Sequence, residues 1–214
     1  MPDPLELLCD ICRRLHARNL LAAADGNVSV LLDDGRIAIT PAGVAKARME
    51  PADLAYLEPG GTVLSGRPSS ERLMHLAIYR ACPEARAVVH AHPPTAVAWS
   101  LARPDLACLP GDALPEVIVA AGAIPFVPYA RPGTAAMGEV LAPFLPEHRL
   151  LVLARHGALA WGETLEEAYN GMERLEHASQ ILAAAERLGG ALPLPAAELE
   201  ALRQARAQSG RRLL

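Results

Sequence analysis

Hydrophobic and polar residues recur along the chain with two different periods. After Asp3 and Pro4, apolar positions from Leu5 to Leu15 follow helical spacing, which predicts a helix ending near Asn19. The same criteria predict helices over 68–82, 94–101, from 133 onward, 163–188 and 195–208. Alternating or continuous apolar runs predict strands over 28–32, 36–40, 55–58, 62–64, 85–92, 117–120, 124–127 and 150–154.

Turn residues join several of these strands in pairs. Residues 33–35 and 59–61 are rich in Asp and Gly and predict two hairpins, whereas 102–115, with three prolines, predicts a loop. No internal repeat and no linker divides the chain. Interleaved hairpins and helices therefore predict one α/β layered domain over 1–214, with a mixed or mainly antiparallel sheet.

Composition excludes several classes of function. Of the 214 residues, 51% are hydrophobic and 21% are charged, which is enough for a sizeable core. The net charge is −4 and no basic run exceeds two residues, so no nucleic-acid partner is expected. No apolar stretch reaches ~18 residues, so no membrane span is expected. The acidic N-terminus does not resemble a signal peptide, and we expect a cytoplasmic protein.

Cysteine and lysine usage narrows the chemistry further. Cys9 and Cys12 form a C-x-x-C inside a helical pattern and without a second pair, which favours a buried helix face over a zinc or redox site. Lys46 is the only lysine. Because its surroundings predict a polar loop with no apolar pocket to lower its pKa, a Schiff-base mechanism is disfavoured.

Three histidines stand at predicted strand ends. His90 and His92 are two apart, so their side chains point to one face of a strand, and His156 follows the apolar run 150–154. Three imidazoles can hold a divalent ion and leave one coordination position open. The alternative is that one histidine of the pair packs in the core and the other faces solvent. The remaining histidines are expected to be structural or exposed: His16, His75, His148 and His177.

Ser69, Ser70 and Glu71 open the helix predicted over 68–82. Free N–H groups and hydroxyls at a helix start can bind phosphate, but the same residues also suit a serine N-cap followed by a first-turn glutamate. The turns at 26–27 and 40–43 are ordinary when each is taken alone. Their glycines could equally let the backbone approach a ligand.

Six short motifs occur in an order that resembles the class II aldolase/adducin family: GNVSV, ITPAG, PSSE, VVHAHP, PYARPGT and ARHGALAWG. The resemblance runs from about Leu5 to Leu188. It implies a three-layer α/β/α domain around a mainly antiparallel sheet, and a homotetramer with active sites between subunits. It also implies a cytoplasmic enzyme of carbohydrate metabolism acting on a small sugar phosphate.

Site residues follow from the same resemblance. It implies that His90, His92 and His156 bind Zn2+, although Mn2+ or Co2+ also suits such ligands. Glu71 matches the catalytic carboxylate. The phosphate-binding positions match Asn27, Gly43, Ser69 and Ser70.

The chain departs from the fuculose-phosphate aldolases of this family in its phosphate loop and at one catalytic position. Ala42 replaces a hydroxyl residue, and Asp25 replaces a small neutral one, so phosphate binding is expected to be weaker. Glu116 stands where those aldolases have a proton-donating tyrosine, and here the chain looks like the methylthioribulose-1-phosphate dehydratases. Glu116 is interpreted as a catalytic acid/base preceding an apolar strand, or alternatively as a solvated loop carboxylate.

The leading hypothesis is a zinc-dependent lyase that cleaves a ketose phosphate by retro-aldol chemistry. A bound ion would stabilise the enediolate that forms when a C–C bond breaks, and a carboxylate would move the proton. The runner-up is a dehydratase that uses Glu116. An epimerase or decarboxylase of the same family, a zinc hydrolase and a non-catalytic module like the adducin head are further alternatives.

Overall fold

An eight-stranded sheet organises the chain, of which the computed structural model describes residues 3–210 and 212–213. The strand order is β4-β3-β2-β1-β5-β8-β7-β6, and every neighbouring pair is antiparallel except β6 and β7. The strands are β1 Asn27–Leu31, β2 Ile37–Ile39, β3 Ala55–Leu57, β4 Val63–Ser65, β5 Ala87–Ala91, β6 Phe126–Val127, β7 Leu150–Leu153 and β8 Gly157–Gly162. The α-helices are α1 Pro4–Ala17, α2 Arg72–Ala81, α3 Pro94–Ala102, α4 Pro115–Ala120, α5 Ala136–Leu141, α6 Leu165–Arg187 and α7 Ala196–Ser209.

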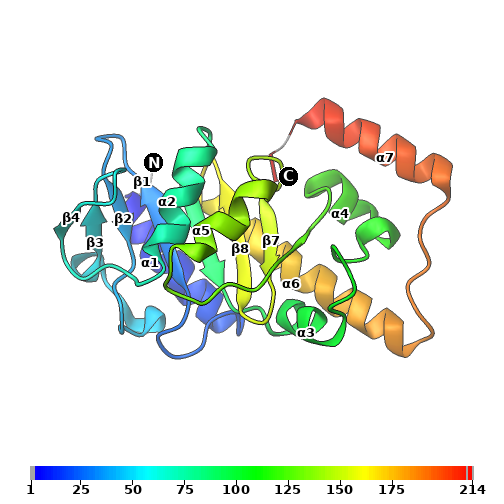
Figure 1. The fold of residues 1–214 in the computed structure, drawn as a ribbon, viewed down its shortest axis with the longest axis horizontal. Helices are drawn as coiled ribbons and strands as arrows, with labels where there is room; N and C mark the ends of the chain where they lie inside the picture. Colours follow the sequence, from blue (N-terminus) through cyan, green and yellow to red (C-terminus); the bar gives the residue numbers. More distant parts are fainter. Residues whose placement is uncertain (1–2, 211, 214) are drawn as a thin grey trace.

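Helices cover both faces of this sheet (Figure 1). On one face α1, α3 and α6 enclose a core that includes Val28, Val89 and Val152. On the other face α2 and α5 pack over residues of opposite parity in the same strands, such as Val88 and Leu151. Since alternate residues of a strand face opposite sides, each central strand contributes to both cores. The predicted three-layer α/β/α fold with a mainly antiparallel sheet is therefore confirmed.

Most elements lie where the hydrophobic pattern predicts them. Asp3 caps α1 by accepting a hydrogen bond of 2.8 Å from the N–H of Leu5. Thr164 caps α6 by accepting one of 3.1 Å from the N–H of Glu167. The Glu167 carboxylate accepts from the N–H of Glu163 rather than from that of Thr164, so the helix start has no reciprocal capping box.

One prediction from the pattern is wrong, and one strand was missed. Residues 117–120 form the helix α4 instead of a strand, because Pro115 begins a helical turn and the apolar residues pack against α7 rather than joining the sheet. Glu116 therefore lies in the first turn of a helix. The central strand β8 was not predicted, because its sequence GALAWG is rich in Ala and Gly, which have low strand propensity.

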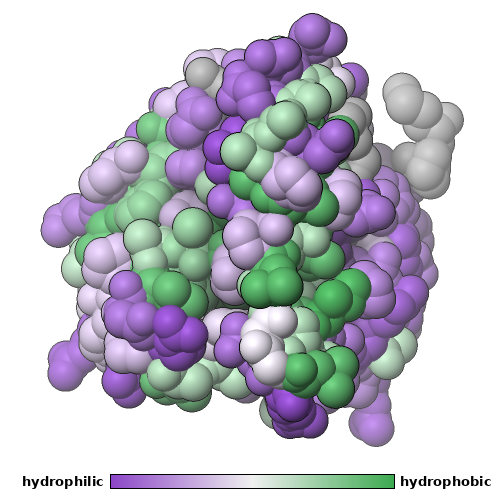
Figure 2. Space-filling view, turned by 90° about the vertical axis from the view of Figure 1, so that its right-hand side faces the viewer, coloured by the Kyte–Doolittle hydropathy of each residue, from purple (hydrophilic) through white to green (hydrophobic). Residues whose placement is uncertain are grey.

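The C-terminal region lies beside the sheet rather than over it. Arg206 of α7 donates hydrogen bonds to the carbonyls of Val119 and Ala120 at the end of α4. In the segment before α7, Leu188 and Leu192 are 90% and 85% exposed. Figure 2 shows this end of the molecule, where hydrophobic residues lie among hydrophilic ones. Within the described residues, no helix has both the length and the apolar character to cross a bilayer.

The C-x-x-C pair has the structural role that the sequence predicts. Cys9 and Cys12 are fully buried on α1. Burial raises the pKa of Cys9 to about 11 and the pKa of Cys12 to about 12, so both are neutral thiols at neutral pH.

Candidate metal centre and substrate site

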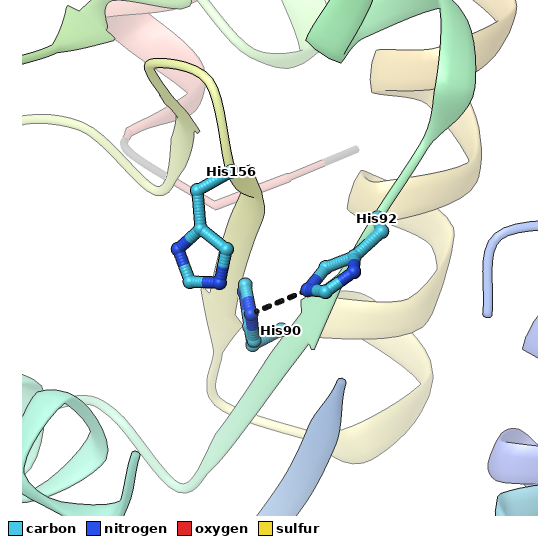
Figure 3. Close-up of side chains that lie close together, drawn as sticks. All are labelled: His90, His92 and His156. Carbon is cyan, nitrogen blue, oxygen red and sulfur yellow. Dashed lines mark hydrogen bonds between the residues drawn. The ribbon is translucent and has the colours of Figure 1, made fainter. Parts of the chain in front are cut away.

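Three imidazoles converge at one edge of the sheet (Figure 3). His90 lies in β5, His92 follows the end of that strand, and His156 lies in the turn between β7 and β8. The candidate ligand atoms all lie within 4.8 Å of one another, and the Nε2 atoms of His90 and His92 are 3.2 Å apart. The structure thus brings together the three histidines for which the sequence predicts a metal site, and the alternative in which one of the pair faces solvent away from the other does not hold.

A tight turn places His156 in this cluster. The His156 N–H donates to the carbonyl of Leu153, and Arg155 adopts a left-handed φ of 63°. Gly157 follows, and a Cβ there would lie 2.8 Å from ring atoms of both His90 and His92. Glycine is therefore required for β8 to approach the imidazoles so closely.

The hydrogen bonding of His90 and the burial of His92 suit metal binding. The Nδ1–H of His90 donates to the carbonyl of Ala158 at 2.9 Å, which leaves its Nε2 lone pair directed into the cluster. Burial, with like charges on His90 and His156, lowers the pKa of His92 to about 4. Neutral imidazoles with lone pairs directed at a common point are the ligands that a divalent ion requires.

Glu71 lies directly against the cluster. Its Oε2 atom is 3.3 Å from His90 Nε2, and its Oε1 atom is 3.1 Å from His156 Nε2. Burial opposes ionisation, but the adjacent His156 and His90 and the Asn27 amide outweigh it and hold the pKa of Glu71 well below its usual range. Oε1 is buried without a partner of hydrogen-bond geometry. An ionised carboxylate with a vacant oxygen beside three imidazoles fits a cation, so these residues suit the metal that the sequence predicts.

A cavity of about 370 Å³ opens beside Glu71, His92 and His156. Its other lining residues come from four segments: Ala24, Asp25, Gly26, Pro41, Ala42, Gly43, Lys46, Ser69, Ser70 and Pro132. Of the predicted phosphate-binding residues, Gly43, Ser69 and Ser70 therefore lie together at one opening. The loops are joined by backbone hydrogen bonds from Ala42 to Arg67 and from Ser69 to Thr40.

The start of α2 does not have the serine N-cap and first-turn glutamate that the sequence offers as an alternative. Glu71 occupies the N-cap position without making a side-chain cap, and the Ser69 hydroxyl accepts a hydrogen bond of 3.2 Å from the Glu71 N–H. Ser69 is therefore not the N-cap of this helix. It stabilises the turn that carries Glu71, and Ser70 is exposed beside it.

Besides His90, two predicted site residues lie outside this cavity lining. Asn27 is 2% exposed and lies behind Glu71, to which its Nδ2 donates at 2.8 Å. Glu116 is exposed on α4 and lines a separate cavity of about 840 Å³ with residues of α6. Within one chain the structure does not bring Glu116 to the histidines.

The environment of Lys46 differs from the prediction. Lys46 is 1% exposed rather than in an open polar loop, and burial lowers its pKa. Its Nζ donates to the carbonyls of Ala24, Pro41 and Val44 at 2.9, 3.2 and 2.8 Å. All three ammonium hydrogens are thus used within the protein, which still disfavours a Schiff-base role but for a different reason.

His75, which the sequence predicts to be structural or exposed, is a buried polar residue. It is 0% exposed and hydrogen-bonded to Asn27 and Ser29, directly behind Glu71. In the sequence, Glu71, His75 and Tyr79 are four residues apart, and this spacing could have indicated that they share one face of the predicted helix.

Comparison with known proteins agrees with this fold. A model of the class II aldolase and adducin N-terminal domain matches residues 6–183. The 3-oxo-tetronate 4-phosphate decarboxylase of Escherichia coli K12 is 36% identical over 186 residues, covering 83% of this chain and 84% of that protein. The L-fuculose phosphate aldolase of Methanococcus vannielii is 33% identical over 171 residues, covering 80% and 91%. A crystal structure of YgbL from Escherichia coli aligns with a TM-score of 0.83 at 33% identity, covering 93% and 97%.

The chain belongs to the class II aldolase and adducin family. The resemblance that the six motifs indicate is therefore confirmed. So is the prediction of an enzyme of the metal-dependent, class II aldolase-type lyases.

Proposed function

We propose that this enzyme cleaves the bond between the α- and β-carbons of a small phosphorylated hydroxy-ketone, using Zn2+ held by His90, His92 and His156. The observation that carries the proposal is the convergence of these imidazoles with the ionised Glu71 beside the cavity that Gly43, Ser69 and Ser70 line. Similarity to the Escherichia coli decarboxylase makes 3-oxo-tetronate 4-phosphate the first substrate to test.

The proposed reaction is a decarboxylation. The bond between C1 and C2 breaks, C1 leaves as CO2, and its electron pair passes through C2 toward the C3 carbonyl. Protonation of C2 then gives dihydroxyacetone phosphate. When bound, a divalent ion supplies Lewis-acid stabilisation of the negative charge that develops on the ketone oxygen.

The residues of the chain have separate tasks in this reaction. Oε1 of Glu71 is buried and without a hydrogen-bond partner, and the ionised carboxylate would accept a proton from solvent and deliver it to C2. The backbone around Gly43 and the residues Ser69 and Ser70 would bind the phosphate. Among the described lining residues the only lysine or arginine is Lys46, whose hydrogens are already used. A substrate carboxylate therefore meets no free cationic side chain there, which favours its loss as neutral CO2.

Retro-aldol cleavage is the second candidate, and the Methanococcus relative supports it. Cleavage of L-fuculose 1-phosphate between C3 and C4 would give the same enediolate, with lactaldehyde in place of CO2 as the second product. The dehydratase alternative depends on Glu116, which one chain alone does not bring to the histidines.

We also propose a homotetramer in which a neighbouring subunit brings Glu116 to the cavity. The exposure of Glu116 on α4 supports this arrangement, as does the apolar surface left by Leu188 and Leu192 in the single chain.

Metal analysis followed by product assays tests the proposed reaction. We expect one Zn2+ per chain, with release of CO2 and dihydroxyacetone phosphate from 3-oxo-tetronate 4-phosphate that stops on addition of a chelator. Lactaldehyde from L-fuculose 1-phosphate without CO2 release from the acid would favour the aldolase instead. A metal-loaded enzyme that acts on neither substrate, or a protein that binds no metal, would contradict the proposal.

Two substitutions distinguish the role of the metal ligands from the role of the Glu71 carboxylate. In Glu71→Gln we expect the metal to remain, because three imidazoles hold it, while kcat falls by roughly 10²-fold or more. In His92→Ala we expect the metal to be lost. Full activity of Glu71→Gln would remove Glu71 from the mechanism, and a full metal complement in His92→Ala would show that the ligands are wrongly assigned.

A further inference from the structure

A continuous chain of hydrogen bonds runs from Glu71 into the core between α2 and β1. The Tyr79 hydroxyl lies 2.8 Å from Ser29 Oγ, and Ser29 Oγ lies 2.7 Å from His75 Nδ1. His75 Nε2 lies 2.5 Å from Asn27 Oδ1, and Asn27 Nδ2 lies 2.8 Å from Glu71 Oε2. Asn27, Ser29 and His75 are each at most 2% exposed. The described side chains therefore connect the proposed acid/base to a dry polar network.

The groups come alternately from α2 and β1, because side chains four residues apart share a helix face and side chains two residues apart share a strand face. Glu71, His75 and Tyr79 are four residues apart, so they lie along one face at the start and through the length of α2. Asn27 and Ser29 are two residues apart, so they lie on one face of β1. β1 also pairs with β5, with Asn27 directly opposite His90. The same register thus places the network behind both Glu71 and a proposed metal ligand.

The donor and acceptor capacity of each group allows only one direction for the hydrogen bonds of this network. An ionised Glu71 can only accept, so the Asn27 amide must present its NH2 group to Glu71 and its oxygen to His75. That oxygen requires a proton on His75 Nε2. Burial, together with like charge on His90, lowers the pKa of His75 to about 3, so the ring is neutral and Nδ1 carries a lone pair.

The remaining two links follow from this tautomer. Because Nδ1 of His75 can only accept, the Ser29 hydroxyl must donate to it. The Ser29 oxygen is then left to accept from the Tyr79 hydroxyl. All four hydrogen bonds are therefore directed toward Glu71, and reversing any one of them places two acceptors or two donors in contact.

We propose that His75 is a positioning residue, which fixes the Asn27 amide in the orientation that holds the Glu71 carboxylate against the three histidines. The inference rests on the proposed role of Glu71 as the proton-moving group. With the opposite His75 tautomer, Asn27 would turn its oxygen toward Glu71. Repulsion between that oxygen and the carboxylate would then displace Oε2 from His90.

The His75 tautomer gives a test that does not depend on catalysis. In metal-free protein labelled with 15N-histidine, NMR should show a neutral His75 ring protonated at Nε2. Ser29→Ala removes only the donor to Nδ1, so the Nε2 proton should remain, held by the Asn27 oxygen. A wild-type ring protonated at Nδ1 would overturn the proposal whether or not the proposed reaction is correct.

Product assays on the metal-loaded enzyme test the consequence for the reaction. Ser29→Ala should lower kcat by roughly 10-fold or more at unchanged metal content, because small displacements of a catalytic group are costly. His75→Gln can still donate to Asn27 and accept from Ser29, so it should keep at least about 10-fold more activity than His75→Leu.

Ser179→Ala provides the matched control for these assays. It also removes a fully buried serine hydroxyl, which bonds to the carbonyl of Leu175 on α6. Activity of Ser179→Ala should stay within about twofold of wild type, because a loss of folding stability does not by itself change the position of Glu71. Equal losses in Ser29→Ala and Ser179→Ala, or equal activity of the Gln and Leu variants of His75, would reduce the network to a structural role and overturn the proposal.

Discussion

At the scale of single residues, buried polar groups hold the candidate site together. Lys46 joins the loop at Ala24 to the loop at Pro41 and Val44 through its three hydrogen bonds. His75 joins Asn27 to Ser29 on the other side of Glu71. Such groups are costly to leave unpaired, so each ties a functional segment to the core.

Removal of the Lys46 ammonium should destabilise the protein. In Lys46→Met the three carbonyls lose their donor, and we expect the free energy of unfolding to fall by about 3 kcal/mol. KM for a phosphorylated substrate should also rise, because both tethered loops line the cavity. Urea unfolding with chelator present measures the first effect, with the exposed Arg48→Met as control, for which a change within about 0.5 kcal/mol is expected. A loss below about 1 kcal/mol in Lys46→Met would contradict these hydrogen bonds.

The buried His75 should make stability depend on pH. Its folded pKa of about 3 lies below the unfolded value of about 6.5, so the unfolded chain binds more protons between these values. Stability from His75 is thus lost as the pH falls from about 6.5, by about 1.4 kcal/mol per pH unit. Metal-free wild type should lose about 2 kcal/mol more than His75→Gln between pH 6.5 and 4.5. Parallel stability curves for the two proteins would show that His75 is not held neutral.

At the scale of elements, the site depends on how closely neighbouring strands approach. The ends of β5 and β8 bring His90, His92 and His156 to one edge of the sheet, and Gly157 lies where any side chain would meet those rings. The loops before β1 and α2 then close the cavity from the adjoining side. The metal cluster is therefore a property of the strand register as much as of the ligands.

A methyl group at position 157 should disturb this register. In Gly157→Ala the new Cβ would lie 2.5 Å from the Ala91 carbonyl oxygen and 2.8 Å from both imidazoles. We expect a destabilisation of roughly 1–3 kcal/mol and at least a tenfold weaker metal affinity, measured by competition with a chromogenic chelator. Gly60→Ala is the control, since its Cβ would meet nothing within 4 Å. Wild-type metal affinity in Gly157→Ala would show that the cluster tolerates a wider separation of the strands.

At the scale of the whole molecule, the proposed chemistry is divided between the histidine cavity and α4. Glu116 lines the other cavity, beside α6, and α7 packs against α4. If Glu116 acts in the reaction, a second copy of the chain must bring it to the first cavity. Assembly and activity should then be coupled.

Native mass measurement tests the proposed assembly. Light scattering should give about 91 kDa, four times the chain mass of 22.7 kDa. A monomer that is fully active would contradict the homotetramer.

Mixed subunits test whether Glu116 acts across an interface. His92→Ala and Glu116→Gln should each be inactive alone, whereas random co-assembly should restore activity at about one quarter of the sites, those with both residues intact. No recovery in mixed assemblies that have formed would place Glu116 outside the neighbouring site.

The sequence by itself determined the elements with strong local signals and the identity of the metal-site candidates. Helices with caps and regular apolar spacing, the two hairpins, and the strand-end positions of His90, His92 and His156 all follow from local pattern and motif order. Even the layered, mainly antiparallel architecture follows from alternating hairpins and helices.

Only the tertiary structure decided the features that depend on distant neighbours. Residues 117–120 became a helix because α7 covers them, and β8 formed despite weak propensity because β5 and β7 pair with it on both sides. Burial of Lys46 and the direction of the His75 network likewise depend on groups far away in sequence. The local spacing of hydrophobic residues predicts the backbone conformation of a segment and which of its faces is buried. The environment of a buried polar group depends instead on which distant segments fold against it.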